Sequence, residues 1–161
     1  MVYFHEEQRF NWVGGLMMIP AVGSGLALFR QVWQGHPIGD PPLANSLLWS
    51  IFVVSVVVAV WFSLTKLVVE VRDDVLSIDF RFLWPLRTIE WRQMRRAEAI
   101  AYRPVRDFGG WGVRWAPRGV VYNTGGNRGV RIYMVSGERV LVGSRRADEL
   151  AQAITARIGA S

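Results

Sequence analysis

The side chains that most often catalyse reactions or bind metals are scarce in this sequence. Its 161 residues include two histidines, His5 and His36, and no cysteine. Zinc sites, haem ligation and nucleophile–histidine pairs draw on these two residue types. We therefore expect no metal site and no bound cofactor.

Two further patterns resemble active-site motifs. Asp73 and Asp74 are adjacent carboxylates, but acids between two predicted strands are common turn residues. The glycine-rich segment 109–112 lacks the Lys-Ser/Thr pair of a phosphate-binding loop and does not join a strand to a helix. Both patterns favour turns, and the sequence predicts that this protein is not an enzyme.

Basic residues are the first candidates for binding. The whole chain has a net charge of +6, and residues 66–161 carry seventeen basic and ten acidic side chains. A basic residue close to an anionic lipid surface contributes about 1 kcal/mol of binding free energy. The candidate lipid headgroup contacts are Lys66, Arg92, Arg95 and Arg96. A solvated basic face would explain the same residues equally well.

Aromatic residues in predicted loops are the second candidates, because such side chains are enriched at protein interfaces. Phe108, Trp111 and Trp115 lie in or just after the glycine-rich segment. Phe82 and Trp84 belong to a short apolar segment between two arginines. The alternative is that these rings fold back into the core of a small domain.

The elements that carry these residues begin with two long uncharged stretches, residues 10–29 and 41–65. A helix needs about 20 apolar residues to cross a bilayer. We expect transmembrane spans at about 10–32 and 43–65, joined by a glycine- and proline-rich turn. Tryptophans lie towards the ends of both spans, as in the aromatic belts of membrane proteins. A cleaved signal peptide and a pair of buried core helices are the weaker alternatives.

Charge near the spans predicts their orientation. The loop that connects the spans contains Asp40 and no lysine or arginine, although Arg30 lies near the outer end of the first span. Arg9 and Lys66 flank the spans on the other side. The positive-inside rule therefore predicts a multi-pass protein of a bacterial inner membrane with both termini in the cytoplasm.

Small residues in the spans predict how they pack, because they allow helix backbones to approach closely in lipid. The candidate packing residues are Ala21, Gly25, Ser55, Ala59 and Ser63. A transport pathway normally needs charged residues within the membrane spans. Neither uncharged stretch contains one, which argues against transport. The hairpin is expected to be an anchor or a packing surface.

The rest of the chain predicts short strands followed by one helix. Val130, Ile132 and Met134 alternate with polar residues, so we expect them to face a core. The helix is expected at about 146–158, with Ser144 as its cap. These elements predict a small, partly open barrel plugged by the C-terminal helix.

The spacing of glycines and apolar residues in this region resembles that of the bacterial pleckstrin-homology-like (PH-like) domains. The residues that carry the resemblance are Gly112, Val113, Arg114, Gly119, Tyr122, Gly129, Val130, Ser136, Gly137, Gly143, Ser144 and the helical run 149–154. With residues 4–10 and the two spans, the chain is similar to a family of uncharacterised bacterial membrane proteins. The resemblance implies a seven-strand split barrel closed by a C-terminal helix, usually a binding or oligomerising module.

We therefore expect two parts: residues 1–66 as N-terminal segment and membrane hairpin, and residues 67–161 as a PH-like domain. The expected function is that of a non-enzymatic membrane subunit, in a homo-oligomer or a bioenergetic or light-harvesting type of complex. The alternative is a membrane-tethered module that binds a lipid headgroup or a peptide. Expected partners are membrane lipids, other membrane subunits or a second copy of the chain, and not nucleic acid. The sequence leaves the partner complex, its stoichiometry and the pathway open.

Overall fold

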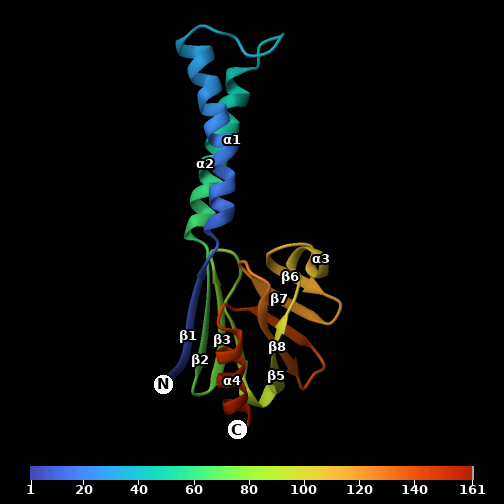
Figure 1. Ribbon diagram of the computed structural model, residues 1–161. Coiled ribbons are helices and arrows are strands. Elements are labelled where there is room, and N and C mark those ends of the chain that lie inside the picture. Colours follow the sequence, from blue (N-terminus) through green and yellow to red (C-terminus); the bar gives the residue numbers. More distant parts are fainter. Residues whose placement is uncertain (161) are drawn as a thin grey trace. The chain divides into compact units, whose positions relative to one another are not determined.

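The computed structural model describes residues 1–160 and separates into two compact units (Figure 1). One unit, Phe10–Leu64, is helical. The other combines Met1–Arg9 with the chain from Thr65 onward and is mainly β-structure. We refer to them as the helical hairpin and the β unit.

The helical hairpin contains two apolar helices. The first is α1 (Asn11–Leu28), which continues as a π-helical turn, η1 (Phe29–Trp33). The second is α2 (Asn45–Leu64). With 23 and 20 residues, both are long and apolar enough to cross a membrane. This agrees with the two spans predicted from the uncharged stretches.

Small residues line the contact between α1 and α2. The buried residues of the two helices are Gly14, Ala21, Ser24, Leu28, Leu48, Ser55 and Ala59. A Cβ atom on Gly14 would lie 2.8 Å from the Ser63 hydroxyl and 3.0 Å from the Ala59 carbonyl oxygen, so the backbones meet there.

Three of the five predicted packing residues, Ala21, Ser55 and Ala59, lie buried between the helices. Gly25 is half-buried beside the Phe52 ring. Ser63 is largely exposed as a residue, but its hydroxyl faces Gly14. The sequence pattern missed Gly14, which makes the closest of these approaches.

The β unit has nine strands in two sheets. The first sheet, sheet A, is antiparallel, with the order β1 (Val2–Arg9), β2 (Lys66–Arg72), β3 (Val75–Arg81) and β4 (Arg87–Glu90). A short 3-10 turn, η2 (Trp91–Gln93), leads from β4 to the second sheet.

The second sheet, sheet B, has the order β5 (Met94–Ala101), β8 (Arg128–Met134), β9 (Arg139–Gly143), β7 (Gly119–Asn123) and β6 (Gly112–Ala116). The pairing of β7 with β9 is parallel and the other three pairings are antiparallel. The short helix α3 (Pro104–Phe108) connects β5 to β6.

Side chains from both sheets and from α4 (Ala147–Ile158) form one apolar core. Leu150 and Ile154 of α4 are fully buried in it. This helix contacts β1 and β5, an edge strand of each sheet. Covering edge strands in this way protects their unpaired backbone groups. The predicted C-terminal helix at about 146–158 is thus confirmed.

The alternation predicted for β8 is also confirmed. Val130, Ile132 and Met134 are buried in the core, whereas Arg131 and Tyr133 are half-exposed on the outer face. Successive strand residues point to opposite faces, so the apolar set fixes which face of sheet B turns inward.

Strand β1 corrects the predicted division of the chain, which grouped residues 1–9 with the hairpin. It pairs with β2 along almost its whole length, and Phe4, Glu6 and Gln8 are buried. Because two of these three residues are polar, no apolar alternation revealed the strand. With β1 present, the β unit has nine strands, two more than the seven expected.

Hydrogen bonds explain how Glu6 and Gln8 can be buried. The Glu6 carboxylate accepts from the Ser144 hydroxyl and, at 2.9 Å, from the Arg145 backbone N–H. Gln8 donates to the Gly143 carbonyl at 2.8 Å and accepts from the Thr124 hydroxyl at 2.9 Å.

Ser144 was expected to cap α4, but this helix begins at Ala147, with no side-chain cap. The Ser144 hydroxyl instead binds Glu6 and accepts from the Arg146 backbone N–H at 3.0 Å. A partner 138 residues away in sequence thus holds this side chain in the turn before the helix.

Candidate functional site

The outer face of sheet B carries a second, smaller apolar cluster. Val121 of β7 and Leu141 of β9 point outward, opposite to the core residues that alternate with them. Tyr102 joins them, and Phe108 packs against the cluster with its ring centroid 5.8 Å from that of Tyr102. Phe108, Val121 and Leu141 of this cluster form the floor of a pocket.

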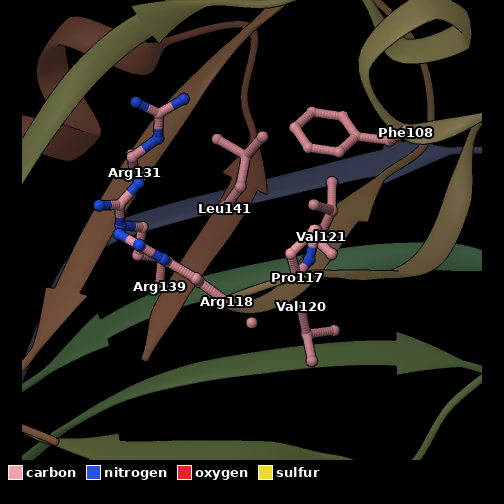
Figure 2. A pocket seen from close by; sticks show the side chains of 10 residues that line it. Phe108, Pro117, Arg118, Val120, Val121, Arg131, Arg139 and Leu141 are labelled. Atoms are coloured by element: carbon pink, nitrogen blue, oxygen red, sulfur yellow. The ribbon is translucent and has the colours of Figure 1, made fainter. Parts of the chain in front are cut away.

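This pocket has a volume of about 260 Å³ and is lined by apolar residues and three arginines, Arg118, Arg131 and Arg139. Figure 2 shows the three arginine side chains gathered on one side of the pocket, with Phe108 and Val121 on the other. We call it the arginine pocket.

Strand pairing brings these arginines together. Arg131 lies opposite Leu141 in the β8–β9 pair, and Arg139 lies beside Gly119 in the parallel β7–β9 pair. The Arg139 backbone N–H donates to the Arg118 carbonyl at 2.7 Å. Gly119 has φ +152°, and a Cβ there would lie 1.7 Å from the Arg139 carbonyl oxygen. Only glycine therefore allows β7 to lie this close to β9 and to bring Arg118 beside Arg139.

The charges in the arginine pocket are poorly compensated. Arg131 lies 3.8 Å from Glu98, a carboxylate that also accepts from the Tyr133 hydroxyl. Within residues 1–160, neither Arg118 nor Arg139 makes an ion pair. Guanidinium groups over an apolar floor can bind an anion that also has an apolar part. Residues 1–160 contain no cluster of three or more His, Asp or Glu that could hold a metal ion.

The predicted headgroup residues do not form one patch. Lys66 pairs with Glu7 at 2.8 Å, at the end of sheet A where β3 ends at Arg81. Arg92 forms an ion pair with Glu90, at the end where β3 begins. Strand β2 is seven residues long, so these two ends are about 20 Å apart.

Arg95 and Arg96 lie closer to the arginine pocket. They line a neighbouring hollow of about 480 Å³ together with Tyr133 and Arg139. The Arg96 guanidinium stacks over the Tyr133 ring, 4.2 Å from its centroid. Arg118, Arg131 and Arg139 were not among the binding residues predicted from the sequence. Alternation in β8 could have placed Arg131 outward, but no local pattern indicates that β7 pairs with β9.

The predicted interface aromatics divide into two sets. Phe108 and Trp111 are half-buried, and Phe108 lines the arginine pocket. Trp84 lies in the connection between β3 and β4 and Trp115 lies in β6, but their rings are in edge-to-face contact, with centroids 6.1 Å apart. Both of these rings are exposed, and so is Phe82.

Comparison of the chain with models of known protein families and with curated proteins finds no match.

Proposed function

We propose that this chain is a non-enzymatic structural or accessory subunit of a membrane assembly, anchored by the helical hairpin. One observation carries the proposal. In the most apolar 18-residue segment of the first helix, only 22% is buried. In the corresponding segment of α2, only 17% is buried. Apolar side chains such as Ile19, Leu26 and Val54 are more than half exposed. A core helix of a soluble protein would be mostly buried, so these surfaces require lipid or an apolar partner.

The β unit supplies the contacts outside the bilayer. Two sheets around one core, with α4 against an edge of each, support the PH-like assignment. Arg9 and Lys66, which flank the hairpin in sequence, support a cytoplasmic position for the β unit at a bacterial inner membrane.

The test of the subunit proposal is purification of the tagged full chain from its native membrane in mild detergent. We expect a stoichiometric complex, or a homo-oligomer by size-exclusion chromatography with light scattering. Mass spectrometry then identifies its components. A chain that remains monomeric, both in detergent and after cross-linking in native membranes, would contradict the proposal.

The arginine pocket favours a second candidate function, binding of an anionic lipid headgroup or acidic peptide by the tethered β unit. The probe is short-chain phosphatidic acid, titrated calorimetrically into the full chain in zwitterionic nanodiscs. The double variant Arg118→Gln with Arg139→Gln should weaken binding about tenfold or more. Arg106→Gln with Arg145→Gln is the matched control, because it removes the same charge from exposed residues outside the pocket lining. Equal affinity of both variants would exclude a specific pocket.

A further inference from the structure

Four exposed apolar residues gather at one end of sheet A. Phe82, Trp84 and Leu86 belong to the connection between β3 and β4, and Trp115 of β6 contacts Trp84. Their exposed fractions are 66%, 40%, 58% and 74%, respectively. We call these four residues the aromatic tip. Leu83, between them in sequence, packs against the main core instead, so the connection itself is held in place.

The backbone at Phe82 is unfavourable for a phenylalanine. Its φ is +64°, the only positive φ at a non-glycine position in residues 1–160. A left-handed conformation costs a residue with a Cβ roughly 1–2 kcal/mol, and burial of a phenylalanine ring would return about that much. Phe82 is 66% exposed, so most of its apolar surface is open to burial by a partner.

The strand register places the aromatic tip close to the points where the chain enters the hairpin. Lys66 of β2 lies opposite Arg9 of β1 on one side and Arg81 of β3 on the other. Arg9 directly precedes the hairpin, and Lys66 follows it after Thr65. Neighbouring strands are about 4.8 Å apart. The tip, which begins one residue after Arg81, therefore lies within about 10–15 Å of both chain entries.

We propose that the aromatic tip inserts into the interfacial region of the same bilayer that the hairpin spans. The inference rests on the proposed membrane hairpin. If its helices end at the membrane surface, the chain entries at Arg9 and Lys66 keep the tip within reach of that surface. Tryptophan is enriched in this region because its ring is amphipathic. Phenylalanine and leucine, with tryptophan, form the apolar faces of segments that lie in the membrane interface.

Charge complementarity also favours lipid. Arg81 keeps half of its side chain exposed although it pairs with Asp79 at 3.0 Å. Arg114, the neighbour of Trp115, is exposed and makes no ion pair in the part of the chain that the structure describes. Such arginines attract the anionic headgroups around an inserted ring. Insertion of the tip would give the β unit a third point of attachment to the membrane, beside its two chain connections to the hairpin.

The absence of native cysteine allows a direct test. Single cysteines replace Phe82, Val135 or Val57 in the full chain, each carries an environment-sensitive fluorophore, and the protein is reconstituted in phosphatidylcholine–phosphatidylglycerol liposomes. Val135 is the matched control, because it is 67% exposed and lies in the turn after β8. Val57, 55% exposed on α2, reports on the hairpin.

We expect lipids with a quencher near the headgroup to quench the label at Phe82 at least twofold more than the label at Val135. Lipids with a quencher deep in the acyl chain should quench the label at Val57. If Val57 is quenched but Phe82 behaves like Val135, the tip inference is wrong while the membrane hairpin stands. If Val57 is not quenched, the hairpin proposal itself fails.

A second variant separates insertion from a role in folding. Phe82→Asn removes the ring and introduces a residue that tolerates a positive φ. Its thermal midpoint should equal or exceed that of the parent chain, while headgroup quenching of a label at Leu86→Cys should fall. A lower midpoint with unchanged quenching would make Phe82 a structural residue and overturn the inference.

Discussion

At the scale of single residues, the buried polar side chains of β1 determine how the start of the chain is held. Glu6 and Gln8 are 7% and 3% exposed, and each has partners far along the sequence. A buried carboxylate is tolerated only when hydrogen bonds replace its hydration. Ser144 and the Arg145 backbone N–H supply them for Glu6.

Glu6→Ala should therefore lower the free energy of unfolding of the β unit by about 1–3 kcal/mol, because both donors lose their acceptor. Glu7→Ala is the matched control, since Glu7 lies on the opposite, exposed face of β1. The measurement is chemical denaturation followed by near-ultraviolet circular dichroism. Equal losses from the two variants would show that the register of β1 is different.

Glu70 gives the β unit a predictable pH dependence. The Arg72 guanidinium donates to its carboxylate at 2.7 Å and is the main reason that the pKa of Glu70 lies below its ordinary value of 4.5. Burial opposes the shift, and His5 adds to it. A lowered pKa stabilises the fold above pH 4.5, and this contribution is lost as the pH falls through the lowered value.

Glu70→Gln should cost at most about 1 kcal/mol of unfolding free energy near neutral pH, because the Arg72 partner is largely solvated. The difference from the parent chain should shrink as the pH drops below 4.5. Denaturation curves across this range provide the measurement, with the exposed Asp74→Asn as control. A difference that stays constant with pH would show that the ion pair does not contribute.

At the scale of elements, the hairpin depends on a few close approaches between its helices. Gly14 and Gly15 are neighbours in α1, but only Gly14 faces α2. A side chain at Gly14 would collide with Ser63 and Ala59, whereas a Cβ at Gly15 has nothing within 4 Å. The pair provides a matched test of helix packing.

Gly14→Leu should force the helices apart and cost about 1–3 kcal/mol, as overpacked sites do. Gly15→Leu should leave the hairpin intact. The measurement is the temperature at which the helical circular dichroism signal is lost in detergent. Equal midpoints for the two variants would mean that α1 presents another face to α2.

At the scale of the whole molecule, the proposed topology places the loop that joins α1 to α2 on one side of a membrane. In this topology the β unit lies on the other side. His36 and Ser136 are exposed positions in these two regions. In a chain without cysteine, a membrane-impermeant maleimide reports each position separately. His36→Cys should be labelled in intact cells and Ser136→Cys only after permeabilisation. The reverse pattern would invert the orientation, and labelling of both in intact cells would exclude a spanning hairpin.

The sequence by itself determined the elements whose pattern is local. The length of the two uncharged stretches predicted α1 and α2. The spacing of apolar residues predicted α4 and the inward face of β8. Turn residues such as Asp73 and Asp74 marked the connection between β2 and β3. These features follow from the periodicity of side chains within about 20 residues. That periodicity is a property of the local sequence and does not depend on tertiary contacts.

Only the tertiary structure decided the contacts between distant segments. Pairing of β1 with β2 joins residues separated by the whole hairpin, and buried Glu6 and Gln8 hid that strand from any apolar pattern. The parallel pairing of β7 with β9 created the arginine pocket, and the approach of β6 to the β3–β4 connection brought Trp115 to Trp84. Such pairings depend on which backbone edges meet across the core, and local periodicity does not encode that choice.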